Sequence, residues 1–159
     1  MRPALIAVLV VTSSACATTG SQPAGEAPPA SRAFLDGLQR AVAGHRWAEV
    51  VDHFAPSYVA AQRDEMLAGR TGQFLVEAFG LASACPGYAG DESRSLACLD
   101  RVCSFRVRTM LEEPGEALPT RVRMEVEPRC GAAAVVGELV LVPGPSQGGK
   151  RLALEGPVG

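Results

Sequence analysis

The chain has 159 residues, of which 47% are hydrophobic and 20% charged, and its 15 basic and 17 acidic side chains leave a net charge of −2. This length supports one domain with a real core, and the hydrophobic fraction excludes a disordered polyelectrolyte. The slightly negative charge argues against nucleic acid as a partner, because neutralising phosphates requires a basic surface.

The first fifteen residues have the pattern of a secretory signal peptide. Arg2 supplies a positive charge, residues 4–11 form an apolar run too short to span a bilayer, and residues 13–15 are small, as a signal peptidase requires. Two cleavage positions fit this pattern. Cleavage after Ala17 would give ordinary secretion and discard Cys16, whereas cleavage after Ala15 would leave Cys16 at the new N-terminus.

The segment VTSSAC, followed by polar residues, resembles the leader of bacterial lipoproteins over residues 1 to about 30. The resemblance implies that fatty acids such as palmitate are attached to Cys16, and that the exported protein is anchored to a membrane of the cell envelope. The absence of Asp at position 17 resembles lipoproteins sent to the outer membrane, in a host that has one. Residues 16–30 contain no large apolar side chain, which predicts a flexible tether between the anchor and the domain.

Hydrophobic residues recur with a helical period over residues 31–81. The first predicted helix has Ser31 as its N-cap and ends at Gly44, and the second continues until Pro56 interrupts it. A third predicted helix ends at Gly69, and a shorter one runs through Phe74 and Phe79. Residues 82–95 are rich in Gly, Pro and Ser and are predicted to form a loop.

From about residue 101 to residue 156 the hydrophobic period changes from 3.6 to 2. The pattern predicts four strands joined by short turns, within residues 103–111, 120–127, 132–142 and 150–156. Helices followed by an antiparallel meander indicate an α+β domain over residues 31–159. Helices on one face of the sheet, with a charged outer face, would bury Val122, Met124 and Val126 on the second strand.

The helical hairpin HRWAEVVDHFAPSYV ahead of a curved sheet resembles the cystatin-like, NTF2-like superfamily over about residues 33–157. This resemblance rests on element order, and the strand that the superfamily places between its second and third helices is not recognisable here. The superfamily includes isomerases and cyclases with a conical pocket, and also pocket proteins without catalysis. The resemblance therefore implies a fold and leaves the function open.

Two functions follow from these observations. The favoured one is a non-enzymatic module that binds an envelope protein or a small apolar ligand, with no cofactor. The alternative is a cystatin-like-fold isomerase or hydrolase, which would need an apolar cavity into which its acid and base side chains point. The candidate acid–base residues for such an enzyme are Asp52, His53, Tyr58 and Asp64.

Three further patterns are interpreted as structural. The segment GPSQGGKR matches parts of a nucleophile elbow and of a P-loop, but a strand follows it and no histidine does, so it predicts a hairpin turn and no nucleotide site. His45 is interpreted as a capping or surface residue and His53 as a half-buried one, neither as a metal ligand. Arginines and glutamates alternate on the strands and predict a solvated ladder of mixed charge. The residues of this ladder are Arg106, Arg108, Arg121, Arg123, Arg129, Glu112, Glu125 and Glu127.

The four remaining cysteines predict two disulfides, because an even number in an exported chain favours bonds. Zinc is the rival ligand, but no C-x-x-C motif occurs. If the first two strands pair so that residue numbers sum to 233, Val107 faces Val126, Arg108 faces Glu125, and Cys103 lies opposite Cys130. Cys85 then pairs with Cys98, and both bonds are predicted to be structural.

Overall fold

The computed structural model describes residues 29–65, 70–110 and 120–156. The predicted signal peptide, Cys16 and the predicted tether up to residue 28 lie outside these residues. Helices occupy the first part of the described chain and strands the second. The helices are α1 (Pro29–Ala43), α2 (Trp47–Val51), α3 (Pro56–Glu65), α4 (Thr71–Ala78) and α5 (Glu92–Leu99). The strands are β1 (Ser104–Met110), β2 (Thr120–Glu127), β3 (Val135–Pro143) and β4 (Leu152–Glu155).

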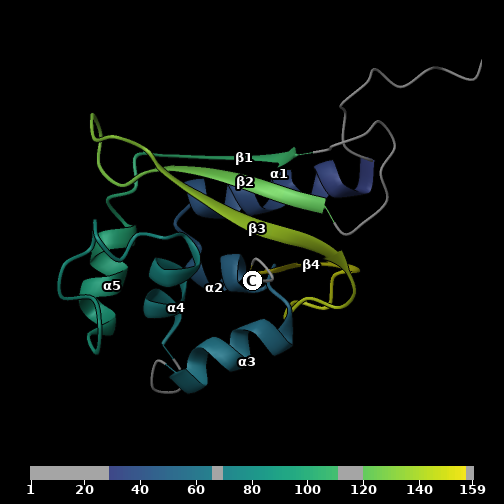
Figure 1. The fold of residues 1–159 in the computed structure, drawn as a ribbon, viewed down its shortest axis with the longest axis horizontal. Coiled ribbons are helices and arrows are strands. Elements are labelled where there is room, and N and C mark those ends of the chain that lie inside the picture. The colour runs from purple at the N-terminus through teal and green to yellow at the C-terminus, as the bar shows by residue number, and fades with distance from the viewer. Residues whose placement is uncertain (1–28, 66–69, 111–119, 157–159) are drawn as a thin grey trace, which may run out of the picture.

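The four strands form one antiparallel sheet in the order β1-β2-β3-β4. In Figure 1, α2 to α5 lie below the sheet, and α1 passes behind β1 and β2. Helices packed on a four-stranded antiparallel meander confirm the predicted α+β class. On β2, Val122, Met124 and Val126 are fully buried, while Arg121 and Arg123, which alternate with them, are exposed, as the alternating pattern predicts.

Helix α1 has the predicted apolar stripe but a different start. Its buried side chains include Leu38 and Val42, which recur at helical spacing. Ser31, predicted as the N-cap, instead lies inside the helix and is 2% exposed. The helix begins at Pro29, because proline lacks the N–H that a first helical turn leaves unsatisfied. The last two residues assigned to the tether are therefore helical.

The third helix also begins at a proline. Helix α2 ends at Val51, before the proline that the sequence pattern predicts as its end, and Pro56 is instead the first residue of α3. The predicted end of this helix at Gly69 lies outside the described residues.

Helix α5 begins inside the segment predicted as a loop, so that prediction was wrong for residues 92–95. The Asp91 side chain accepts a hydrogen bond from the Arg94 N–H at 3.0 Å and caps the helix. The Glu92 carboxylate accepts from the backbone N–H groups of Gly72 at 2.8 Å and Gln73 at 3.3 Å. It therefore satisfies the first turn of α4. Capping defines this short helix more than a long apolar stripe does.

The pairing of β1 with β2 corrects the predicted register by two residues. Partners sum to 231 rather than 233, so Val107 faces Met124 and Arg108 faces Arg123. A shift by two keeps every side chain on its predicted face, because side chains alternate with a period of two. The hydrophobic pattern alone therefore fits both registers. The predicted pairs that involve Leu111 and Glu112 lie outside the described residues.

Both predicted disulfides are confirmed. Cys85 is bonded to Cys98 and Cys103 to Cys130, with Cα–Cα distances of 5.7 Å and 5.0 Å. Cys130 reaches its partner by a turn rather than from a ladder position opposite Cys103. The Cys103 N–H donates to the Glu127 carbonyl at 2.9 Å, and the chain then bends back after β2.

The two parts of the chain are joined at the β4 edge of the sheet. Phe54, between α2 and α3, forms an isolated parallel bridge with Leu154. The Leu154 N–H donates to the His53 carbonyl and the Ala55 N–H donates to the Leu154 carbonyl, each at 2.9 Å. Phe54 and Leu154 are both fully buried in one core that includes side chains from the helices and the sheet.

Candidate functional site

The four residues offered as an acid–base set do not share a described cavity. Asp52 and Tyr58 are half-buried and His53 is 1% exposed. None of these three lines the pocket between α1 and β1, the hollow beside α5 or the shallow depression on α1. Asp64 belongs to α3, but its side chain lies outside the described part.

His53 is enclosed between α1 and the end of α2. Its ring lies edge-on to Phe34 with centroids 5.0 Å apart, and Nδ1 is 2.8 Å from the Glu49 carbonyl oxygen. Because a carbonyl only accepts, the neutral ring carries its proton on Nδ1. Nε2 has no hydrogen-bond partner in the described chain and lies beside Gly37. Burial lowers the pKa of His53, and this effect outweighs the hydrogen bond to Glu49, which acts in the opposite direction.

Tyr58 is packed among aromatic rings. Its ring centroid is 5.9 Å from that of Phe54 and 5.8 Å from that of Phe74. A side chain at Gly156 would collide with the Tyr58 ring, so the chain after β4 passes close to it. Burial raises the pKa of the Tyr58 hydroxyl, and nearby Glu77 adds to this effect. The tyrosine is therefore neutral and contributes to the core.

The segment GPSQGGKR connects β3 to β4 by the predicted hairpin turn. The Gly144 N–H donates to the Arg151 carbonyl at 2.9 Å and the Ser146 N–H to the Lys150 carbonyl at 3.0 Å. Ser146 is 3% exposed, and its hydroxyl accepts from the Lys150 N–H. The Gly148 N–H donates to the Asp52 carbonyl at 3.0 Å. The turn therefore supports the end of α2 and offers neither a nucleophile nor a phosphate cradle.

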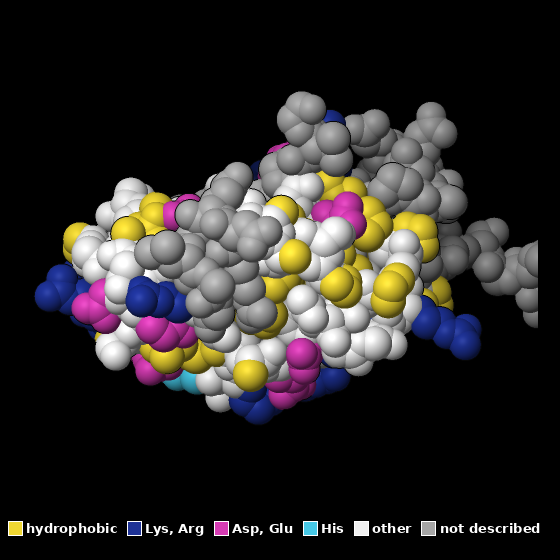
Figure 2. All heavy atoms as spheres, turned by 90° about the horizontal axis from the view of Figure 1, so that it is seen from below, with side chains coloured by type: hydrophobic (Ala, Val, Ile, Leu, Met, Phe, Trp, Pro, Cys, Tyr) yellow, Lys and Arg dark blue, Asp and Glu magenta, His cyan; other side chains and the backbone are white. Residues whose placement is uncertain are grey.

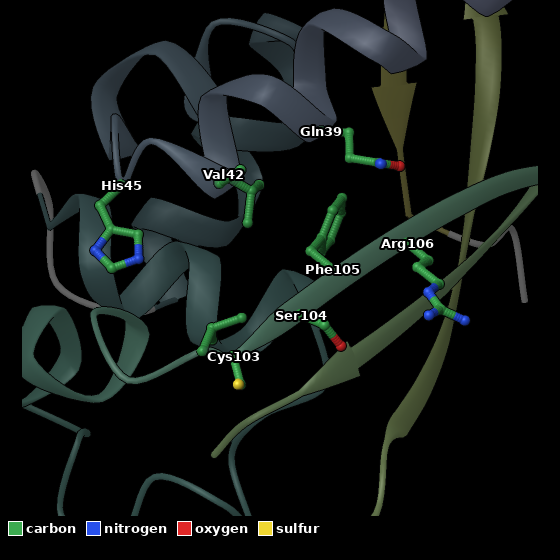
Figure 3. A pocket seen from close by; sticks show the side chains of 9 residues that line it. Gln39, Val42, His45, Cys103, Ser104, Phe105 and Arg106 are labelled. Atoms are coloured by element: carbon green, nitrogen blue, oxygen red, sulfur yellow. The ribbon is translucent and has the colours of Figure 1, made fainter. Parts of the chain in front are cut away.

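A pocket of about 330 Å³ lies elsewhere, between the C-terminal half of α1 and the start of β1 (Figure 3). Its volume lies at the lower end of the range of small-molecule sites. Its walls combine apolar side chains with a few polar ones from both elements. They are formed by Gln39, Val42, Ala43, His45, Val102, Cys103, Ser104, Phe105 and Arg106.

His45 stands at this pocket in a strained conformation. Its φ is +53°. Among the residues that the structure describes, it is the one residue other than glycine with a positive φ. It occupies the left-handed position of a Schellman motif, in which the Arg46 N–H donates to the Ala41 carbonyl and the His45 N–H to the Val42 carbonyl. Glycine usually holds this position because a Cβ atom there costs energy.

Two neighbours hold the imidazole of His45 in place. The ring stacks on Trp47 with centroids 5.4 Å apart, and its Nδ1 lies 3.7 Å from an Asp100 carboxylate oxygen. The same oxygen accepts a hydrogen bond from the Trp47 indole N–H at 2.8 Å. The structure therefore fixes a polar ring at the mouth of a pocket, at the cost of an unfavourable backbone conformation.

The chemistry of this pocket suits binding better than catalysis. Cys103 is held in a disulfide and offers no thiol, while the Ser104 hydroxyl donates to the Glu127 carboxylate at 3.1 Å. Gln39 and Arg106 supply donors, while Phe105 and Val42 supply apolar surface. This combination is typical of a site that orients a small, partly apolar molecule.

Sequence reasoning did not identify this pocket. It interpreted His45 as a surface residue, which is correct, but gave no indication of its backbone conformation. Gln39 and Arg106 stand in patterns of ordinary helix and strand surfaces. The pocket exists because α1 crosses β1, and nothing in the local sequence specifies that crossing.

On the helical side of the molecule, basic and acidic side chains lie next to one another, with hydrophobic side chains scattered between them (Figure 2). This face therefore presents mixed charge rather than a field of one sign. Among the described residues no group of three or more His, Cys, Asp or Glu side chains is arranged to hold a metal ion. None of the described helices has the length and apolar character needed to cross a membrane.

Comparison with protein-family models, curated proteins and solved structures found no match to this chain.

Proposed function

We propose that this chain is a lipid-anchored protein of the bacterial cell envelope, whose α+β domain binds a partner protein or a small molecule without catalysing a reaction. The cysteines carry this proposal. The chain has five cysteines, and four of them form two disulfides with one another. Disulfides of this kind persist in exported proteins. Cys16 is then the cysteine left for acylation, at the end of the signal-like leader.

The binding role follows from the pocket beside His45. His45 keeps an unfavourable backbone conformation although glycine would remove the strain, and strained residues concentrate at functional sites. The pocket walls hold donors and apolar surface, and the cysteine among them is tied in a disulfide. We therefore place the ligand of the proposed binding module in this pocket.

Membrane attachment is tested on the full-length chain expressed in a bacterium with the lipoprotein pathway. We expect the purified protein to begin at Cys16, with the mass of attached fatty acids, and to partition into the detergent phase. Cys16→Ser should remove the added mass and the partitioning. Ser14→Ala keeps a small residue near the cleavage position and serves as a matched control that should be acylated normally. A mature N-terminus at Thr18, or an unmodified Cys16, would contradict the proposal.

A further inference from the structure

A second hollow, of about 500 Å³, lies between the loop after α4, helix α5 and the turn after β2. Three arginines line it, whereas none of its lining residues is acidic, although the chain as a whole has more acidic than basic side chains. This distinguishes the hollow from the mixed charge of the helical face. It is lined by Ser83, Ala84, Cys85, Pro86, Arg94, Ala97, Cys98, Arg101 and Arg129.

The guanidinium groups keep most of their donors available. The Arg129 guanidinium makes no hydrogen bond or ion pair with any part of the chain that the structure describes, although the Arg129 backbone carbonyl accepts from the Ala132 N–H at 2.9 Å. Arg101 uses only Nε, which donates to the Ala97 carbonyl at 3.0 Å and orients the guanidinium group. Arg94 is partly neutralised, because its Nε lies 3.2 Å from an Asp91 carboxylate oxygen. At least two of the three arginines can therefore offer paired N–H groups to a ligand.

The acidic residues nearest along the chain to Arg101 and Arg129 are engaged elsewhere. Asp100 accepts from the Trp47 indole on the side of the other pocket. Glu127 accepts from the Ser104 hydroxyl at 3.1 Å and from the Gly131 N–H at 2.6 Å. Within the described residues, one of the three arginines is therefore partly neutralised, while the other two keep their charge for a ligand.

The two disulfides fix the segments that carry the arginines. Cys85–Cys98 forms part of the wall and ties the loop at 83–86 to α5. Cys103–Cys130 ties the turn that carries Arg129 to the segment that follows Arg101. Covalent links therefore hold the backbone segments that carry the three arginines around one space, which reduces the ordering that a ligand must impose on binding.

We infer that this hollow binds the phosphate group of a small organic phosphate. Arginine matches phosphate because its planar fork donates two parallel hydrogen bonds to two oxygens, and a phosphate has enough oxygens for several such forks. The hollow is larger than a bare anion needs, and Ala84, Pro86 and Ala97 give it apolar surface for an attached organic body. The phosphate does not belong to a nucleic acid, because three arginines on an acidic chain do not form the extended basic surface that a nucleic-acid backbone requires. The inference does not depend on the proposed anchoring or on the pocket beside His45.

Two arms of one experiment separate a soluble phosphate ester from a lipid head group. The chain is used with both disulfides intact and with Cys16→Ser, which prevents acylation. In the first arm, glycerol 3-phosphate is titrated and binding is followed by amide chemical shifts. In the second arm, co-sedimentation is measured with vesicles of phosphatidylglycerol, against phosphatidylcholine as the neutral-charge reference.

Arg129→Gln and Arg101→Gln are the test variants, and Arg108→Gln, an exposed arginine on β1, is the matched control. We expect saturable binding in at least one arm, weakened about tenfold by each test variant and unchanged by the control. Binding should also weaken as salt is raised. Arg129→Gln should keep the thermal midpoint of the parent, since it removes no internal contact, so loss of binding is separable from loss of fold.

Three results would overturn the inference. They are the absence of binding in both arms, equal weakening by Arg108→Gln, and binding of a dicarboxylate such as succinate as tight as that of the phosphate ester. The first arm identifies a soluble ligand, and binding in the vesicle arm alone identifies a lipid head group. Failure of acylation at Cys16 would leave these outcomes unaffected.

Discussion

At His45 the chain accepts a left-handed backbone conformation that glycine would adopt more easily, and the cost can be measured. His45→Gly and His45→Ala both remove the imidazole, its stacking on Trp47 and its approach to Asp100. Only the alanine variant has a Cβ atom, which is unfavourable at positive φ. We expect the glycine variant to have a free energy of unfolding higher than that of the alanine variant by about 1 kcal/mol. Urea unfolding of both measures this, and an alanine variant of equal stability would show that the position is not strained.

His53 should make stability depend on pH. Its pKa is lowered in the folded protein, while in the unfolded chain an imidazole titrates near about 6.5. As the pH falls below this value, the imidazole binds a proton in the unfolded state but remains neutral in the folded state. The free energy of unfolding therefore falls as the solution is acidified. We expect His53→Gln, which cannot titrate, to lose less stability than the wild type between pH 7.5 and pH 5.5.

Thermal unfolding at several pH values provides the measurement for His53. Carboxyl groups titrate in every variant, so the difference between the two curves isolates the imidazole. Parallel curves for the wild type and His53→Gln would contradict the prediction.

At the scale of the elements, the register of β1 on β2 predicts opposite effects for two neighbouring substitutions. Arg108 faces Arg123, whereas Arg106 faces Glu125. Arg108→Glu should therefore stabilise the sheet and Arg106→Glu should destabilise it, each by about 0.2–1 kcal/mol. In the register that sums to 233, Arg108 would face Glu125 and Arg108→Glu would destabilise. Urea unfolding of the two variants distinguishes the registers by the sign for Arg108→Glu.

The two disulfides should be reduced in a fixed order. Cys85 is 2% and Cys98 7% exposed, while Cys103 and Cys130 are both exposed. A thiolate must reach a sulfur atom to break the bond. We therefore expect dithiothreitol to open Cys103–Cys130 in the folded protein, and Cys85–Cys98 only when the chain unfolds. Partial reduction, alkylation and peptide mapping give the order, and early alkylation of Cys85 and Cys98 would refute it.

The elements show what sequence patterns can and cannot specify. Burial of Val122, Met124 and Val126 follows from alternation, and the stripe of α1 follows from its helical period. Helix α5 was missed because its N-cap, Asp91, stands in a segment rich in Gly, Pro and Ser. The register was misjudged because a shift by two residues keeps every side chain on the same face of the sheet. The predicted Cys103–Cys130 disulfide still forms in the observed register, because the turn after β2 brings Cys130 to Cys103.

The candidate sites were less predictable than the elements, for a physical reason. His53 was expected to be half-buried, but the packing of α1 encloses it almost completely. Arg94, Arg101 and Arg129 belong to separate segments and meet only through the packing of α5 and the turn after β2. A site assembled by tertiary crossings leaves no spacing motif in the chain.

For the whole molecule, helices and sheet share one core, which predicts a single unfolding transition. The chain has one tryptophan, Trp47, which lies at the start of α2 in the helical half. Its fluorescence reports on the helices, while far-ultraviolet circular dichroism also reports on the sheet. We expect the two probes to give coincident urea curves. Leu154→Ala should shift both curves together, by about 2–5 kcal/mol, because it opens a cavity at the junction. Separate transitions would show that the halves unfold independently.

The bridge between Phe54 and Leu154 sets the order in which the chain can finish folding. Hairpins of the meander close short loops and form quickly, but this bridge closes a loop that spans most of the domain and is slower. A chain that emerges N-terminus first, from a ribosome or a translocation pore, contains its helices before β4 is available to pair with Phe54. During that interval Phe54 and its apolar neighbours are exposed to chaperones and proteases. Loss of β4 would make that vulnerable state permanent.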